Sequence, residues 1–170
     1  TNSQLYDFFV TTPPNTTYLA IFAETSDKGG LYVDDFEVVS INGCTSTALS
    51  TVTVGETNVV QNPEFNSGTT SWELYAQGGA AATLNHDNTS QLSGVNSARI
   101  NISTATGTDW HVQFVENGLT LEAGKTYTLS FRARAAAARV INASVDLGQD
   151  PWTNYLYQNV NVTTTGQLFT

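Results

Sequence analysis

Leu31-Tyr-Val-Asp-Asp-Phe-Glu-Val-Val39 decides the fold, because it has the form of the closing strand of a β-sandwich module. Asn58-Val-Val-Gln-Asn-Pro-Glu-Phe-Asn-Ser-Gly68 has the form of the opening strand, and it comes later in the chain. The order expected of such a module is therefore rotated, with its end before its beginning. A sandwich without its last strands would expose sheet edges and half of its core. Residues 1–40 thus contain the end of such a module without its beginning, and residues 58–170 contain the beginning without the end.

Alternation of apolar and polar residues predicts strands along most of the chain. The alternation runs through residues 18–24, 125–134, 140–147 and 156–162, and turns containing glycine separate these segments. Helical periodicity is nearly absent. Many short strands between turns predict an all-β fold in which two antiparallel sheets pack face to face.

Composition limits the classes of partner. The net charge is −9 with only six Lys and Arg residues and no basic cluster, so binding to nucleic acid is disfavoured. Apolar runs are too short to cross a bilayer, so no membrane insertion is expected. The chain contains no Met, and we expect it to begin after processing or to be an excerpt. Cys44 is the single cysteine, expected as an unpaired thiol, with pairing outside the chain as the second possibility.

The chain divides into three segments. Residues 1–40 carry the closing strands, and residues 58–170 carry the opening and central strands. Residues 41–57 are polar and poor in aromatics, which predicts a linker. About seventeen extended residues span up to roughly 55 Å, more than is needed to join neighbouring ends of a sandwich.

Four motifs in the second half of the chain occur together: Asn62-Pro-Glu-Phe-Asn-Ser-Gly68 with Ser71-Trp72, then Leu92-Ser-Gly-Val-Asn-Ser-Ala-Arg-Ile100, Asp109-Trp-His-Val-Gln-Phe114 and Leu121-Glu-Ala-Gly-Lys-Thr-Tyr-Thr-Leu-Ser-Phe-Arg-Ala133. Together they resemble the CenC-like carbohydrate-binding modules of families 4, 9, 16 and 22. These modules are β-jelly rolls appended to bacterial glycanases. Their closing strands look like Gln4–Val10, Tyr18–Phe22 and Leu31–Val38, which stand at the front here.

The resemblance implies a two-sheet antiparallel jelly-roll β-sandwich that the N-terminal strands complete. It also implies a non-catalytic module that holds a neutral β-glycan, of the β-glucan or xylan type, in an aromatic groove. Such a module targets an attached protein to the polysaccharide, so we expect an extracellular location, secreted or on a bacterial cell surface.

The rotated order leaves a second hypothesis open. The chain is either cut from a tandem array or forms a composite sandwich, and we favour the composite. Residues 1–40 then complete the same chain, as a circular permutant, or a neighbouring chain by strand exchange. Strand exchange would make the protein a structural subunit or adhesin repeat of an extracellular assembly, with identical subunits as partners and calcium at the joint.

Sugar recognition requires flat aromatic faces and planar polar groups. By resemblance, Trp110 and Gln113 match groove positions, and Trp152 matches an aromatic that faces the same groove. The alternative is that Trp110 or Trp72 simply belongs to the core. We expect Trp72 to lie nearer to the core or at its rim. Arg132 points outward by alternation and is either a groove residue or a solvated one. The full set of carbohydrate-binding candidates is Trp110, Gln113, Trp152, Tyr155, Tyr157, Arg132, Phe22 and Glu24.

A second set of residues predicts a cation site. By resemblance, Asp34 aligns with the acidic residue that ligates structural Ca²⁺ between the first and last strands, and hard cations take oxygen ligands. Asp34 is expected on the face of Tyr32 and Phe36, taken as inward, where a charge needs a partner. The alternative is an exposed Asp34–Asp35 pair at a strand end. The remaining candidate ligands are Glu64, Asn66, where the family more often has Glu, and the carbonyls of the turn from Ser93 to Asn96.

Catalysis finds no support. A glycosidase needs two carboxylates across the scissile bond, and none of the fifteen acidic residues stands in a recognisable hydrolase context. His86 and His111 lack partners at metal-ligand spacing, and no nucleophile motif occurs. We therefore expect no catalytic residue and no enzymatic activity.

Overall fold

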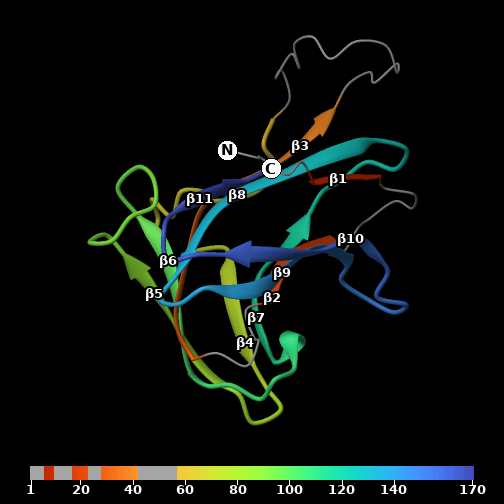
Figure 1. The fold of residues 1–170 in the computed structure, drawn as a ribbon. Coiled ribbons are helices and arrows are strands. Elements are labelled where there is room, and N and C mark those ends of the chain that lie inside the picture. Colours follow the sequence, from red (N-terminus) through yellow and green to blue (C-terminus); the bar gives the residue numbers. More distant parts are fainter. Residues whose placement is uncertain (1–5, 10–16, 23–27, 42–56) are drawn as a thin grey trace.

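The computed structural model describes residues 6–9, 17–22, 28–41 and 57–170. Apart from one short 3₁₀ turn, η1 (Asp109–His111), the regular elements of these residues are strands. In chain order (Figure 1) they are β1 (Tyr6–Phe9), β2 (Thr17–Phe22), β3 (Gly29–Ile41), β4 (Trp72–Ala76), β5 (Ala81–Asp87), β6 (Ser97–Thr104), β7 (Val112–Leu119), β8 (Thr126–Ala135), β9 (Arg139–Leu147), β10 (Asn154–Val162) and β11 (Gln167–Phe169).

The strands form two antiparallel sheets. Sheet A has the order β1-β8-β3-β6-β5, with β11 also paired to β8, and sheet B has the order β10-β9-β2-β7-β4. The sheets pack face to face around one apolar cluster. The prediction of an all-β, two-sheet antiparallel sandwich is therefore confirmed.

Two of the three strands from the front of the chain, β2 and β3, lie in the interior of the sheets. β2 lies between β9 and β7, with Ile21 opposite Ala143 on one side and Phe114 on the other. β3 lies between β8 and β6, and β1 pairs with β8 at the edge of sheet A. In this structure the sandwich is thus completed by strands of its own chain.

The segment that follows residue 56 runs beside β3. The Val59 amide donates to the Val38 carbonyl at 3.1 Å, and the Phe36 amide donates to the Pro63 carbonyl at 3.2 Å. The Asn58 side chain donates to the Phe36 carbonyl at 2.9 Å and accepts from the Val38 amide at 3.0 Å. The opening segment and the closing strand, reversed in sequence order, therefore lie side by side.

Aromatic rings from both sheets fill the centre of the sandwich. Phe36 stacks on Phe131 at 5.5 Å within sheet A, and Trp72 stacks on Phe114 at 4.6 Å within sheet B. Phe36 and Trp72 meet across the layers at 4.5 Å. Trp72 is 5% exposed, and its indole N–H donates to the Gln61 carbonyl at 3.2 Å. Trp72 therefore belongs to the core, with its polar atom satisfied.

A β-bulge in β3 gives Asp34 a different orientation from the one expected. Leu31 and Val33 face the core, and the register then shifts between Asp34 and Glu37, where Asp35 has φ 51°. An extra residue at a bulge reverses the alternation, so Phe36 faces the core while Asp34 stays on the outer face. The expectation that Asp34 and Phe36 share an inward face is therefore wrong.

Candidate functional site

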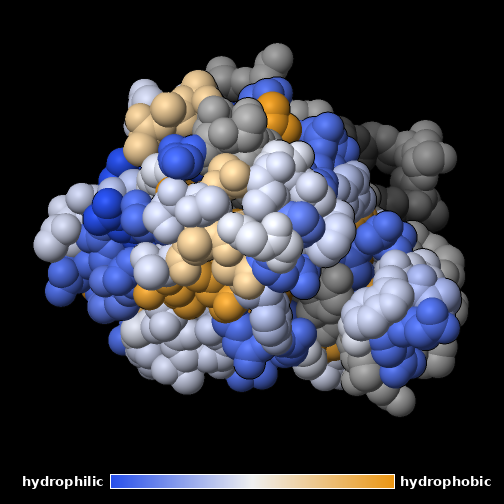
Figure 2. All heavy atoms as spheres, turned by 90° about the horizontal axis from the view of Figure 1, so that it is seen from below, coloured by the Kyte–Doolittle hydropathy of each residue, from blue (hydrophilic) through white to orange (hydrophobic). Residues whose placement is uncertain are grey.

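Among the side chains that the structure describes, most of the large apolar ones that remain exposed are aromatic and belong to one region. Tyr75, Trp110, Trp152 and Tyr157 are 45–58% exposed, on β4, η1, the β9–β10 loop and β10. The underside of the molecule is mostly hydrophilic, with hydrophobic colour in small separate areas (Figure 2). Exposed rings gathered on one side of a sandwich point to a binding surface.

A cleft of about 440 Å³ opens on the outer face of sheet B. β4 and β7 supply most of its lining, and the loop after β9 supplies the opposite side. The lining residues are Tyr75, Gln77, Gln113, Val115, Asn117, Gly148 and Trp152. The cleft therefore combines two exposed rings with three carboxamides.

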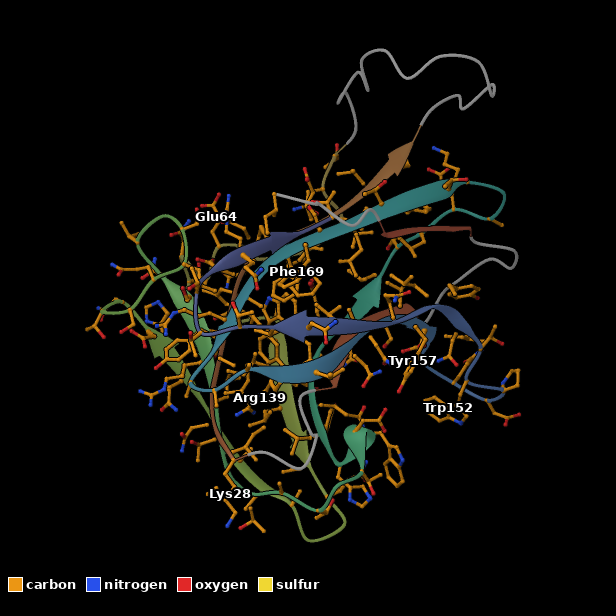
Figure 3. All side chains as sticks on the ribbon, in the orientation of Figure 1. Lys28, Glu64, Arg139, Trp152, Tyr157 and Phe169 are labelled. Carbon is orange, nitrogen blue, oxygen red and sulfur yellow. The ribbon has the colours of Figure 1, made fainter. Side chains whose placement is uncertain are left out.

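Trp152 is presented by a strained loop between β9 and β10 (Figure 3). The strain lies at Trp152 itself, whose φ is 54°. The Trp152 amide donates to the Gln149 carbonyl at 2.7 Å, which closes the turn. A non-glycine residue in the left-handed region is uncommon and often marks a functional position.

Hydrogen bonds fix the polar side chains around the cleft. The Glu73 carboxylate accepts from the Tyr75 hydroxyl and, at 3.1 Å, from the Asn117 amide. The hydrogen bond to Glu73 raises the pKa of Tyr75. Gln113 and Gln77 both donate to the Trp110 carbonyl, at 2.7 and 3.2 Å.

Contacts with its neighbours link η1 to the same surface. Asp109 accepts from the Trp110 amide at 2.9 Å and from the Tyr157 hydroxyl. Burial, and then the hydrogen bond to Asp109, raise the pKa of Tyr157, so this hydroxyl remains a donor. Trp110 is 50% exposed, which contradicts the alternative that it is a core residue.

Four of the predicted sugar-binding residues come together in this region. Gln113 and Trp152 line the cleft, whereas Trp110 and Tyr157 adjoin it through their contacts with Gln113 and Asp109. Phe22 pairs with Gln113 on β7 and Asn142 on β9, and its side chain lies outside the described residues. Glu24 also lies outside them.

The structure places two predicted residues elsewhere. Tyr155 is the extra residue of a bulge between Asn154 and Leu156, and it packs against the core cluster. Arg132 faces outward as expected, but β8 belongs to sheet A, so this outer face is not that of the cleft. There Arg132 forms an ion pair with Asp35 at 2.8 Å.

Sequence reasoning missed Tyr75, Gln77, Val115, Asn117 and Gly148. A signal existed for two of them, because Trp72 and Leu74 face the core and Tyr75 must then face outward. Asn117 likewise shares a face of β7 with Gln113. Gln77 and Gly148 lie outside the strands and reach the cleft only through tertiary packing.

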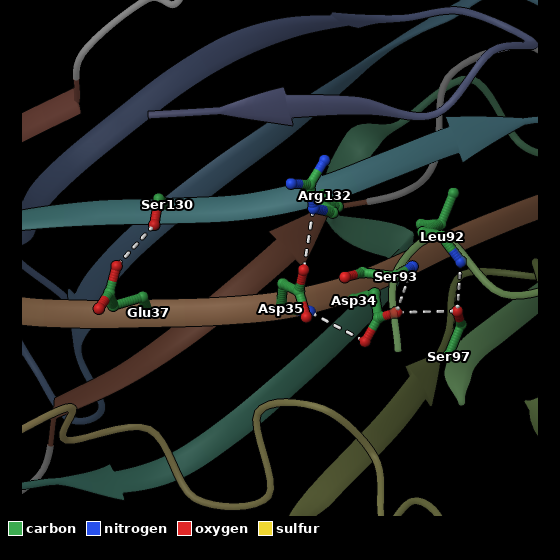
Figure 4. A network of polar contacts seen from close by, with 8 residues as sticks. All are labelled: Asp34, Asp35, Glu37, Leu92, Ser93, Ser97, Ser130 and Arg132. Atoms are coloured by element: carbon green, nitrogen blue, oxygen red, sulfur yellow. Dashed lines mark hydrogen bonds and ion pairs between the residues drawn. The ribbon is translucent and has the colours of Figure 1, made fainter. Parts of the chain in front are cut away.

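The predicted cation ligands surround one loop, at residues 92–97. Asp34, which is 1% exposed, accepts hydrogen bonds from the Ser93 amide at 3.2 Å and the Ser97 hydroxyl at 3.1 Å (Figure 4). Its other carboxylate oxygen accepts from the Asp35 amide at 2.9 Å. Burial raises the pKa of Asp34 to about 6.

Of the other predicted ligands, Asn66 contacts the same loop and Glu64 contacts Asn66. Asn66 donates to Glu64 at 2.9 Å, and Asn96 donates to Asn66 at 2.9 Å. The candidate metal-ligand atoms are therefore oxygens of two carboxylates and two carboxamides, the type of ligand that Ca²⁺ prefers. Their negative charge is low: among the described residues, no group of three or more His, Cys, Asp or Glu is placed to hold a metal ion.

The fold is a two-sheet β-sandwich, and a cleft with exposed aromatic rings lies on one of its sheets. The model of the carbohydrate binding domain family CBM_4_9 matches residues 57–169, so the chain belongs to this family. Domains of this type are non-catalytic, and a polysaccharide is the partner that they imply. No curated protein and no solved structure matches the chain. Within the described ranges, no helix has the length and apolarity needed to span a bilayer.

Proposed function

We propose that the sheet B cleft binds a neutral β-glycan, of the β-glucan or xylan type, and targets an attached extracellular protein to it. The observation that carries the proposal is the cleft itself, in which Tyr75 and Trp152 expose their rings on either side of Gln113 and Asn117. Aromatic faces pack against the C–H faces of pyranose rings, and carboxamides both donate to and accept from hydroxyls.

The charge around the cleft supports a neutral ligand. No Lys or Arg is among the lining residues, and Glu73 and Asp109 place carboxylates beside the lining side chains. A glycan that carries uronate or sulfate groups would meet like charge here. Neutral sugars meet no such penalty.

Calorimetric titration with soluble β-glucan and xylan tests this function. We expect Trp152→Ala and Tyr75→Ala each to weaken binding by about tenfold or more, because exposed aromatic anchors carry much of the affinity of such surfaces. Trp110→Ala is expected to act in the same direction. Leu168→Ala is the matched control, since Leu168 is 46% exposed on sheet A, away from the cleft. The proposal fails if no glycan binds, or if the aromatic variants bind like the parent.

The alternative function, a subunit completed by strands of a neighbour, is less well supported. β2 and β3 fill central positions of the two sheets within one chain. A single chain therefore supplies every strand that the alternative takes from a partner.

We also propose that calcium stabilises the joint between β3, the 62–68 turn and the 92–97 loop. Asp34, Glu64 and Asn66 would supply side-chain oxygens, with Asn96 and the carbonyls of the loop. The support is that the Asp34 carboxylate is buried, while Arg132, its register partner on β8, forms its ion pair with Asp35. A bound cation would compensate this buried charge.

A further inference from the structure

The β4–β5 turn contacts η1 at Trp110 and His111. The Gln77 amide donates to the His111 carbonyl at 2.9 Å, and the Ala80 amide closes the turn on Gln77 at 2.9 Å. The His111 ring lies so close to Gly78 that a Cβ added there would stand 2.2 Å from Cε1 of the ring. Real Cβ atoms do not approach a neighbouring atom this closely, so only glycine allows the contact.

His111 in turn contacts Trp110. The two rings meet edge to face, with centroids 4.3 Å apart at 84°. On its other side, His111 Nδ1 is 2.6 Å from the Thr106 hydroxyl. The His111 imidazole is therefore held by Gly78 and Thr106 and supports the indole of a half-exposed tryptophan.

We propose that His111 is a positioning residue, seated on Gly78, which fixes the Trp110 indole in the orientation that receives a sugar ring. The inference rests on the proposed glycan-binding function and adds residues that do not line the cleft. A ring held in place before binding loses less conformational entropy when the ligand arrives, so its support contributes to affinity.

Gly78→Ala tests the contact between Gly78 and the His111 ring, and Gly79→Ala is the matched control. Both glycines have positive φ, 62° and 92°, so both variants carry backbone strain. An added Cβ at Gly79 meets nothing within 4 Å, whereas one at Gly78 displaces His111. We expect Gly78→Ala to weaken glycan binding about tenfold and Gly79→Ala to leave it nearly unchanged.

A second readout needs no ligand. The indole N–H resonance of Trp110, assigned from its loss in Trp110→Phe, should shift in Gly78→Ala and stay in place in Gly79→Ala. His111→Ala should also shift it and weaken binding. Adding Gly78→Ala to His111→Ala should then cause little further loss, because the ring that clashes is gone.

Three results would overturn the inference. The two glycine variants could move the Trp110 resonance equally, His111→Ala could leave both binding and resonance unchanged, or the resonance could shift while affinity stays at the parent value. If the parent binds no glycan, the proposed function fails. The positioning role of His111 can still be tested in that case, because the Trp110 resonance is measured without ligand.

Discussion

The Tyr157 hydroxyl donates a hydrogen bond to the Asp109 carboxylate and so links β10 to η1 across sheet B. β9 and β2 lie between β10 and β7, the strand that follows η1, so the link crosses two strands. On β9, the polar residues Asn142, Ser144 and Asp146 are at most 5% exposed. The part of the sheet B face open to a ligand therefore lies over β7 and β4.

Removing this hydrogen bond should loosen η1. Tyr157→Phe keeps the ring but leaves the Asp109 carboxylate without this donor, and hydrogen bonds to charged groups contribute on the order of 1 kcal/mol or more. We expect glycan binding to weaken by about fivefold in calorimetric titration. Tyr155→Phe, on the same strand but packed on the core, should leave affinity at the parent value. Equal affinity in Tyr157→Phe and the parent would contradict the role of the link.

The raised pKa of Tyr157 predicts how this link responds to alkali. Because burial and Asp109 favour the neutral phenol, the hydroxyl remains protonated at about pH 10, where an ordinary tyrosine is half ionised. The ultraviolet titration of tyrosinate should therefore contain late-ionising groups, and one of them should be missing in Tyr157→Phe. If Tyr157→Phe instead removed an early-ionising tyrosine and kept the late-ionising group, the prediction would be contradicted.

Glu116 predicts a loss of stability as the pH rises. It is 1% exposed on β7, accepts from the Gln61 amide at 2.7 Å, and burial raises its pKa from 4.5 to about 7. Its second oxygen has no hydrogen-bond partner among the described residues. A carboxyl with a raised pKa in the folded state contributes full stability below about pH 4.5 and loses it as the pH rises through about 7.

Glu116→Gln isolates this effect, because the amide oxygen can still accept from Gln61. Each pKa unit corresponds to about 1.4 kcal/mol, so the variant should exceed the parent by up to about 3 kcal/mol at pH 8 and resemble it near pH 4. Urea unfolding across this range measures the difference. The Asp34 contribution, which falls in the same direction, is common to both proteins and cancels. Parallel curves of stability against pH would exclude a buried ionisation at Glu116.

Calcium should raise the thermal unfolding midpoint of the parent. A ligand that binds only the folded state stabilises it by about 2.7 kcal/mol when its concentration is a hundred times Kd. Asp34→Asn removes the central carboxylate and should abolish the response to calcium. Glu37→Gln is the matched control, because Glu37 lies on the same strand and accepts from the Ser130 hydroxyl at 3.3 Å rather than contacting the predicted ligands. An unchanged midpoint in calcium and in chelator would exclude the site.

Alternation in the sequence predicts which side of a strand faces inward, and this held where strands are regular. The alternation over residues 125–134 places Tyr127, Leu129, Phe131 and Ala133 on one face, and all four are buried. Alternation cannot show which of two outer faces a residue reaches, so it left Arg132 as either a groove residue or a solvated one, and the structure places it on sheet A. It also fails at bulges, which displaced Asp34 and Tyr155 without any glycine to signal them.

Residues of the candidate site were predictable only where they belong to a family motif or to a strand with regular alternation. Gln113 and Trp152 came from the resemblance, and the phase of β4 would have added Tyr75. Gln77 and His111 are positioned by a contact between the β4–β5 turn and η1, two segments more than thirty residues apart. No local pattern encodes such a contact, because it depends on how the sheet brings the turns together.

The rotated order of strands leads to a last prediction, on mass. β11 and β1 follow each other along the same edge of β8, where Phe169 pairs with Phe131 and Tyr6 pairs with Leu129. One chain thus fills both halves of this edge, and β2 and β3 are paired on both sides. We expect light scattering to give a monomer of 18.3 kDa, with or without chelator.

A protease site engineered between residues 42 and 56 extends this test. After cleavage, the fragment with β1, β2 and β3 should remain bound to the fragment with residues 57–170, because β2 pairs with both β7 and β9 and the two pieces share one core. Denaturant should separate them at the same concentration that unfolds the sandwich. Species at multiples of 18.3 kDa before cleavage, reduced to single sandwiches after it, would instead show that residues 1–40 complete a neighbouring chain.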